Sequence, residues 1–122
     1  YHPMKINILI VDNDEVMIKI LSDFLSKDSR FNISTALNGN SSLEIVKEHK
    51  IHLLITDLQM PEMNGIELLT TLRKDIPEIK SIILTGHSDI DSYIETMELG
   101  AHEYLNKPVD LPLLKDVINK LL

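Results

Sequence analysis

Residues 6–11 read INILIV, a short apolar run rich in β-branched side chains, and Asp12, Asn13 and Asp14 follow it directly. An apolar run without polar alternation is typical of a strand that is buried on both faces of a parallel sheet. Over residues 15–25, apolar side chains recur at mostly helical spacing, and the carboxylate of Asp14 can cap the first turn of such a helix. The beginning of the chain therefore predicts a buried strand that leads into an amphipathic helix.

The same pattern of a short apolar run followed by a helical period repeats along the whole chain. Further strands are expected at residues 31–36, 52–56, 81–85 and 102–105, and further helices at residues 40–49, 66–74, 90–99 and 111–122. Five strand–helix pairs at this spacing require parallel strands joined by crossover helices. The expected fold class is α/β, with helices on both faces of one sheet and the strand carboxyl ends along one edge, where such folds bind ligands.

The length and composition limit the class of protein. A chain of 122 residues fits one domain, which we expect to cover residues 1–122, with a natural start at Met4 and residues 1–3 derived from a vector. Its 12 basic and 19 acidic residues give a net charge of -7, which argues against direct contact with nucleic acid or an anionic membrane. With no cysteine and no apolar run near the roughly 20 residues of a membrane span, we expect a cytoplasmic protein. Because the last predicted helix reaches Leu122, we hypothesise that any output domain lies outside this chain.

Polar residues follow several of the predicted strands. Asp12 and Asp57 come directly after the first and third strands, and neighbouring strand ends would bring their carboxylates together. A hard divalent cation such as Mg²⁺ would relieve the repulsion between them. Lys107 and the hydroxyl of Thr85, which also follow or end strands, can stabilise phosphoryl oxygens as charge moves. The set predicts a phosphoryl-transfer site with an aspartate nucleophile.

Each of these residues also has a structural interpretation without chemistry. Asp14 is better explained as a helix cap, whereas Asp57 precedes Leu58-Gln59-Met60-Pro61, where no helix is expected to begin. Alone, Thr85 is equally explained as an ordinary strand-end hydroxyl and Lys107 as an exposed lysine before a proline. Their combination at one edge favours the phosphoryl-transfer interpretation.

Six segments of the sequence resemble response regulator receiver domains of two-component signal transduction systems. They are LIVD at 9–12, LITDLQMP at 54–61, NG at 64–65, ILTG at 83–86, GA at 100–101 and YLNKP at 104–108. The resemblance covers residues 5–122, and the combination is far more specific than any one segment. Within it, Thr85-Gly86-His87 resembles receivers of nitrogen-regulatory transcription activators, so transcription regulation is the implied process.

The resemblance implies a flavodoxin-like (βα)5 three-layer sandwich with strand order 2-1-3-4-5. Asp57 would accept a phosphoryl group from a sensor histidine kinase or a phosphotransfer protein, and the domain would not be a turnover enzyme. Mg²⁺, or Mn²⁺ in its place, would be held by Asp12, Asp57 and the backbone carbonyl of Gln59. Asn13, which follows Asp12, would add at most an uncharged carbonyl oxygen.

The resemblance also assigns roles around the phosphorylated aspartate. Thr85 and Lys107 would contact the phosphoryl oxygens, and Gly86 would be small enough for a donor to approach. Tyr104 would be a switch residue that turns inward as Thr85 moves toward the phosphate. Without the resemblance, Tyr104 is better explained as a half-buried strand aromatic.

Further residues and one surface receive structural roles from the same resemblance. Pro61, Gly65 and Pro108 would shape the loops, and the bond between Lys107 and Pro108 would be cis. His87 would border the phosphate entry path, although a solvated loop histidine is an equal interpretation, and none of the five histidines is assigned to a metal. A homodimer would use the face formed by the last predicted strand and the helices on either side of it.

Asn13 departs from the family, which usually has an acid at this position, and this departure leaves other functions open. One is a pseudo-receiver that binds a partner without being phosphorylated. Another is a haloacid-dehalogenase-like phosphatase, because VDNDEV at 11–16 is similar to the opening of those enzymes, with Asp12 as nucleophile. The cap and the late acidic pair of such phosphatases are missing. A flavin-binding protein is disfavoured because acids stand where a glycine- and hydroxyl-rich phosphate loop is needed.

Overall fold

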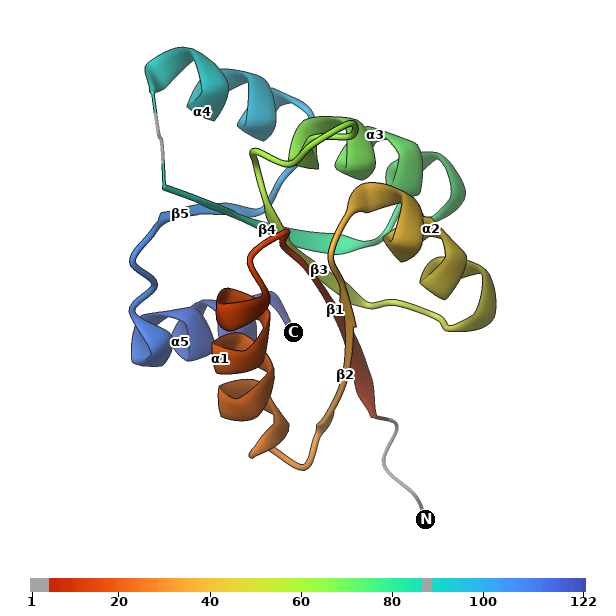
Figure 1. Cartoon of the computed structure of the whole chain (residues 1–122), viewed down its shortest axis with the longest axis vertical. Coiled ribbons are helices and arrows are strands. Elements are labelled where there is room, and N and C mark those ends of the chain that lie inside the picture. The colour runs from red at the N-terminus through yellow and green to blue at the C-terminus, as the bar shows by residue number, and fades with distance from the viewer. Residues whose placement is uncertain (1–4, 87–88) are drawn as a thin grey trace.

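The computed structural model describes residues 5–86 and 89–122, which form one five-stranded parallel sheet with helices on both faces (Figure 1). The strands are β1 (Ile6–Val11), β2 (Phe31–Ala36), β3 (Leu53–Asp57), β4 (Lys80–Thr85) and β5 (Glu103–Asn106). The helices are α1 (Glu15–Ser26), α2 (Gly39–Glu48), α3 (Gly65–Asp75), α4 (Ile90–Glu98) and α5 (Leu111–Leu121). The strand order β2-β1-β3-β4-β5 confirms the expected flavodoxin-like topology. None of the helices within the described residues is long and apolar enough to cross a membrane.

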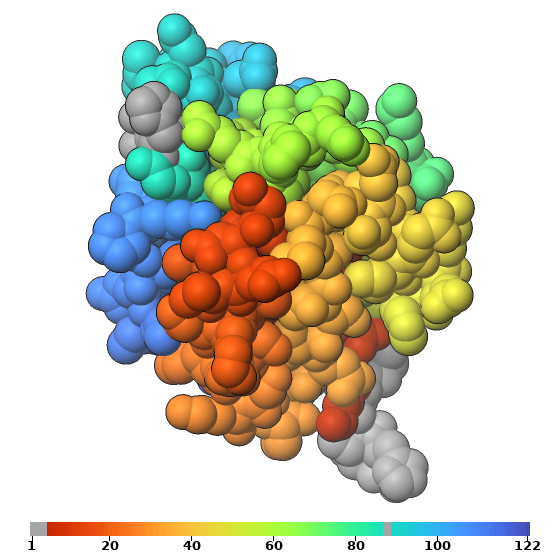
Figure 2. Space-filling view, in the orientation of Figure 1, coloured from red at the N-terminus to blue at the C-terminus, as the bar shows by residue number. Residues whose placement is uncertain are grey.

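The sheet is buried on both faces because successive residues of a strand point to opposite sides. In β1, Ile8 and Ile10 pack in the core shared with α1 and α5, whereas Leu9 and Val11 pack in the core shared with α2, α3 and α4. All four side chains are at most 1% exposed, and burial of each contributes roughly 1.5–3 kcal/mol to folding. The three layers that result are visible in Figure 1, and Figure 2 shows α4 and the β5–α5 segment along one side of the molecule. The predicted three-layer sandwich is confirmed.

All ten predicted elements are present, and each predicted boundary lies within one residue of the observed one. The cap predicted for α1 is confirmed, because Oδ1 of Asp14 accepts hydrogen bonds from the N–H groups of Val16 and Met17 at 2.9 and 3.3 Å. One shift of a single residue affects the site: β3 ends at Asp57 instead of Thr56. The backbone of Asp57 is therefore part of the sheet rather than of the loop that follows.

At the opposite, amino-terminal edge of the sheet, two histidines extend the strand pairing with their rings. The N–H of His52 donates to the Asn7 carbonyl at 2.9 Å, and Nδ1 of His52 accepts from the Asn7 N–H at 2.9 Å. His102 forms the same pair of bonds with Ser81, at 3.0 and 3.2 Å. A ring nitrogen accepts a hydrogen bond only when it carries no proton, so protonation of Nδ1 would break the bond that His102 accepts from Ser81.

A charged network fastens α5 to the loop between α1 and β2. The carboxylate of Asp28 lies 2.7 Å from the Arg30 guanidinium and 2.9 Å from Nζ of Lys115 on α5. Both cations also lie over the Phe31 ring, at 5.0 and 5.4 Å from its centroid. Hydrogen bonds from Arg30 and then Lys115 hold the pKa of Asp28 far below its ordinary value. The lysine of α5 nearest the middle of the helix is therefore already paired within the domain.

The ring contact of His102 predicts how stability depends on pH. Burial, with the nearby charges of Lys80 and Arg73, lowers the pKa of His102 below its ordinary value of 6.5. The unfolded chain then binds a proton more readily than the folded one, so the free energy of unfolding should fall as pH decreases below about 6.5. We expect His102→Asn, which retains an acceptor but cannot titrate, to flatten this decrease, as measured by urea unfolding between pH 7.5 and 5.

The matched control is His49→Asn at the exposed end of α2, which should leave the pH profile as it is in the wild type. A profile that is equally steep in His102→Asn and in the wild type would contradict a role for the His102 ring.

Candidate functional site

Three charged side chains meet at the carboxyl edge of the sheet. Asp12 directly follows β1, Asp57 ends β3 and Lys107 directly follows β5. The parallel register pairs Val11 with Thr56, so the residues that come next stand side by side. Nζ of Lys107 lies 2.7 Å from Oδ2 of Asp12 and 3.4 Å from Oδ2 of Asp57. The predicted convergence of these three residues is confirmed.

Burial strengthens the interactions among these charges. Asp12 is 1% exposed and Asp57 is 8% exposed. Burial, and then the negative charge of Asp12, raise the pKa of Asp57, against the opposing effects of Lys107 and the Gln59 N–H. Burial alone would lower the pKa of Lys107, but its hydrogen bond to Asp12 and the charges of both carboxylates outweigh this effect and raise it. The charged form of Lys107 is therefore favoured, and its single positive charge faces two carboxylates.

The backbone around Asp57 is fixed from several sides. Thr56 donates a hydrogen bond from Oγ1 to the Asp57 carbonyl at 3.0 Å, and the Gln59 N–H donates to Oδ1 of Asp57 at 3.3 Å. The N–H of Gly65, at the start of α3, donates to the Leu58 carbonyl at 2.8 Å. A Cβ at position 65 would collide with the Asp57 carbonyl oxygen, so only glycine allows α3 to begin this close to the site.

The turn that joins Asp57 to α3 is also tightly built. The Met63 N–H donates to the Pro61 carbonyl at 2.8 Å, and Glu62 between them has a positive φ of 69°. Asn64 then caps α3 in a capping box with Glu67. The N-x-x-E spacing of that box is a local signal in the sequence that marks where the helix begins.

Thr85 and Gly86 lie between the site and β5. Thr85 is fully buried, and its carbonyl accepts a hydrogen bond from the Lys107 N–H at 2.8 Å. Gly86 is exposed, and a Cβ there would come only within 4.0 Å of the Lys107 side chain, which is an ordinary contact. The bond between Lys107 and Pro108 is cis, as the resemblance predicted.

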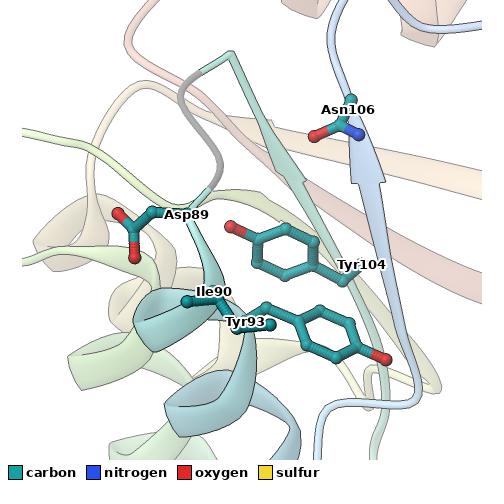
Figure 3. Close-up of a pocket in the computed structure, with 5 residues that line it drawn as sticks. All are labelled: Asp89, Ile90, Tyr93, Tyr104 and Asn106. Carbon is teal, nitrogen blue, oxygen red and sulfur yellow. The ribbon is translucent and has the colours of Figure 1, made fainter.

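Tyr104 lies one strand away from Thr85 and is half-buried, on the side of β5 that faces α4. Its ring meets that of Tyr93 edge to face, with ring centroids 5.3 Å apart and planes at 90°. Its phenol points toward Asp89 (Figure 3). Burial, and then the charge of Asp89, raise the pKa of Tyr104, whereas a hydrogen bond with the Thr85 side chain lowers it. The structure therefore places Tyr104 between the surface of α4 and the strand that carries Thr85.

The remaining predicted metal ligands lie at the solvent side of the site. Asn13 and Gln59 are both exposed and follow the two buried aspartates by one and two residues. Over residues 5–86 and 89–122, no three His, Cys, Asp or Glu side chains are grouped so that they could hold a metal by themselves. Two carboxylates with an uncompensated negative charge, together with carbonyl oxygens, nevertheless suit Mg²⁺, which takes few protein ligands and retains water. His87 lies outside the described residues.

Sequence reasoning missed one contact that holds α4 in place. Nη1 of Arg73, in the last turn of α3, donates to the Leu99 carbonyl at 2.5 Å, just past the end of α4. Gly100 follows with a φ of 97°, and a Cβ there would overlap the Arg73 guanidinium. No local signal links residues 73 and 99, because their contact depends on how the helices pack.

A five-stranded parallel sheet that carries two buried carboxylates and a lysine at its carboxyl edge defines an α/β domain with an acidic, cation-compensated site. The sequence matches the family model for the response regulator receiver domain over residues 8–119. It is 35% identical to the probable transcriptional regulator ycf29 of Porphyra purpurea over 121 residues, which cover 98% of this chain and 57% of the relative. It is 34% identical to the transcriptional regulatory protein ZraR of Salmonella typhimurium, over 97% of this chain and 26% of that protein.

A crystal structure of a response regulator receiver domain protein from Clostridium thermocellum superposes with a TM-score of 0.88 and 35% identity, covering 95% of this chain and 93% of that one. The chain belongs to the response regulator receiver domain family. It spans about a quarter to just over a half of the length of the curated relatives named above. The predicted family, with its resemblance to receivers of transcription activators, is confirmed. Receiver domains are signalling domains that work with histidine kinases or phosphotransfer proteins.

The two glycines near Asp57 should respond differently to the same substitution. Gly65→Ala should lower the free energy of unfolding by about 1–3 kcal/mol, because the added methyl group meets backbone that cannot move away. Gly86→Ala, its matched control, should change the free energy of unfolding by no more than about 0.5 kcal/mol. Urea unfolding of both variants measures the difference, and equal stabilities would refute the close approach of α3 to Asp57.

Proposed function

We propose that this receiver domain accepts a phosphoryl group on a carboxylate oxygen of Asp57, from the phosphohistidine of a sensor histidine kinase or a phosphotransfer protein. The carboxylate oxygen forms a bond to phosphorus as the phosphorus–nitrogen bond of the donor breaks. The donor imidazole retains the electron pair of that bond and leaves as a neutral ring, provided that its other nitrogen carries a proton. The observation that carries the proposal is the Lys107 ammonium between the buried carboxylates of Asp12 and Asp57.

The residues around Asp57 would have separate roles in this transfer. Lys107 is held charged by two carboxylates, so it can shift toward a phosphoryl oxygen without a change in protonation. Thr85 supplies a hydroxyl from the end of the neighbouring strand. Gly86 leaves open space next to Lys107, through which a donor can approach. Asp57 must be ionised to act as a nucleophile, and Lys107 favours its ionised form against burial.

Mg²⁺, or Mn²⁺, would be held by Asp12, Asp57 and the carbonyl oxygen of Gln59, with Asn13 as an uncharged fourth ligand. The ion would supply positive charge to the phosphoryl oxygens. Asp12 is positioned for this role, because one of its oxygens accepts the Asp14 N–H at 2.9 Å and the other faces Lys107. Because the Asn13 amide carries no charge, the cation site would be weaker than one with an acid at this position.

Phosphorylation would act on the rest of the molecule through Thr85 and Tyr104. If phosphate binds one arrangement of Thr85 better than the other, it shifts the population of Tyr104 and of the surface made by α4, β5 and α5. This surface would bind the partner that reads the signal, or a second copy of the domain. In a longer protein related to the transcriptional regulators above, the reader would be an output domain.

One incubation tests the proposal against its two rivals. The domain is mixed with Mg²⁺ and acetyl phosphate, and its intact mass is followed over time. Uptake of one phosphoryl group per chain supports the receiver function. Continuous release of phosphate without a stable adduct indicates a phosphatase that uses Asp12. If there is neither uptake nor release, the domain is a pseudo-receiver. Lys107 lies closer to Asp12, at 2.7 Å, than to Asp57, at 3.4 Å, so the carboxylate of Asp57 is the less tightly held of the two.

Asp57→Asn should abolish phosphoryl uptake and leave the fold intact. The amide is nearly isosteric but a poor nucleophile, and removal of one of two neighbouring negative charges relieves repulsion. The matched control is Asp14→Asn, which retains the helix cap and should take up phosphate as the wild type does. Wild-type uptake by Asp57→Asn, read from the intact mass, would refute Asp57 as the acceptor.

Asn13→Asp should bind Mg²⁺ more tightly than the wild type, because it restores a full charge near the cation. Desolvation and repulsion from Asp12 and Asp57 limit the gain to roughly 1 kcal/mol, which is several-fold in affinity. Calorimetry measures the affinity, since the chain has no tryptophan to report on it. Asn119→Asp adds the same charge on α5 and should have no effect, and an unchanged affinity in Asn13→Asp would show that position 13 does not face the metal.

Phosphorylation should change the amide NMR shifts of Tyr104 and of α4, in addition to those near Asp57. The reason is that Tyr104 lies between Thr85 and α4, so a shift in either neighbour alters its surroundings. Asp57→Asn treated in the same way is the control and should show no change. Shift changes limited to the immediate neighbours of Asp57 would contradict the switch.

A further inference from the structure

The surface of α4 and β5 carries most of the net charge of the chain. Residues 89–106 contain five acidic residues and neither lysine nor arginine: Asp89, Asp91, Glu95, Glu98 and Glu103. They contribute -5 of the net -7, so the other 104 residues together contribute only -2. Asp91, Glu95 and Glu98 are exposed on α4, and within the described part of the chain none of these three takes part in a salt bridge. The negative charge of α4 therefore faces solvent.

Apolar and aromatic groups lie among these acids. On α4, Ile90 is 68% exposed, Tyr93 43% and Ile94 45%. A cavity of about 340 Å³ opens between α4 and β5, lined by Asp89, Ile90, Tyr93, Tyr104 and Asn106 (Figure 3). Its walls are thus two aromatic rings, an aliphatic side chain and the amide of Asn106, with the Asp89 carboxylate at one end.

This combination suits one kind of side chain. The aliphatic stem of a lysine or arginine can lie along Ile90, while its cation lies next to the tyrosine rings and within the negative field of the acids on α4. An acidic side chain would be repelled by the acids of α4, and a purely apolar one would leave Asp91, Glu95 and Glu98 without a basic partner. Charge and shape together favour a basic group with an apolar stem.

We propose that the cavity between α4 and β5 receives a lysine or arginine side chain from a basic segment of a partner protein. The proposal deepens the proposed function, because the cavity belongs to the surface that phosphorylation would alter. The exposed acids of α4 would pair with further basic residues of the same segment, and Ile90 and Ile94 would contact its apolar residues.

A second copy of this domain fits the same surface less well. In a symmetric pair, the acidic segments of both copies would lie in one interface, where like charges repel. The basic residues available to compensate them on the adjacent helix α5 are few. Lys115 is already paired with Asp28, whose carboxylate lies 2.9 Å from its ammonium group. The other lysine of α5 is Lys120, and its positive charge is offset by the negative charge of Asp116 on the same helix. Charge therefore favours a different, basic chain as the occupant.

The test uses the unphosphorylated domain and a short fluorescein-labelled peptide of alternating leucine and arginine, followed by fluorescence anisotropy. A peptide with glutamate in place of arginine is the probe control and should not bind. Asp91→Lys combined with Glu95→Lys should weaken binding about tenfold, the size expected when two surface charge pairs become repulsive. Glu48→Lys combined with Glu78→Lys makes the same change in net charge at exposed positions away from α4 and should leave binding nearly unchanged.

Tyr93→Leu distinguishes binding in the cavity from general electrostatic attraction, because it removes the aromatic ring but leaves the net charge unchanged. We expect this substitution to lower the affinity of the domain for the arginine peptide several-fold. Equal weakening by both pairs of reversals, binding of the glutamate peptide, or no effect of Tyr93→Leu would overturn the proposal. Self-association of the wild type in sedimentation that the α4 reversals abolish would instead assign the surface to a second copy. Phosphoryl uptake from acetyl phosphate, measured on the same variants, shows separately whether the receiver function is intact.

Discussion

The Lys107 ammonium between the carboxylates of Asp12 and Asp57 is the interaction on which the carboxyl edge of the domain depends. Two nearly buried carboxylates side by side are unfavourable, because burial disfavours each charge and each charge disfavours the other. A cation at 2.7 and 3.4 Å compensates one of the two negative charges but not both. The site is therefore stable in the folded domain and still able to attract positive charge. This balance suits a site that binds a metal ion and a phosphoryl group reversibly.

The fold is what imposes this arrangement. Helices on both faces require parallel strands, and parallel strands end at one edge, so residues that follow different strands meet there although they are distant in the sequence. Asp12 and Lys107 are 95 residues apart in sequence and share a hydrogen bond. The approach of α3 to the back of Asp57, which Gly65 permits, then fixes the backbone of this residue and leaves its carboxylate edge open.

Sequence alone predicted the elements and most of the site, because both depend on local signals. Apolar runs and helical periods located all ten elements, and the polar residues at strand ends located Asp12, Asp57, Thr85 and Lys107. The strand order had no such local signal and came from the resemblance to a family. The close approach of Gly65 to Asp57, the ring acceptors of His52 and His102, and the bond from Arg73 to Leu99 all join residues that only packing brings together. In the sequence, a glycine, a histidine or an arginine at these positions does not by itself indicate such a contact.

The molecule has two acidic regions, one at Asp12 and Asp57 and one on α4, and they differ in how far their charge is exposed. At Asp12 and Asp57 the excess negative charge is buried and partly compensated by the protein itself, whereas on α4 it is exposed and left to solvent. Tyr104 lies between them, with Thr85 on the neighbouring strand and Tyr93 on α4. If one arrangement of Tyr104 is favoured both by phosphate at Asp57 and by a basic group in the α4 cavity, each ligand must strengthen the binding of the other by the same factor. A partner that binds α4 would then shift the equilibrium toward the phosphorylated arrangement as well as read it, since the same free energy of coupling acts in both directions.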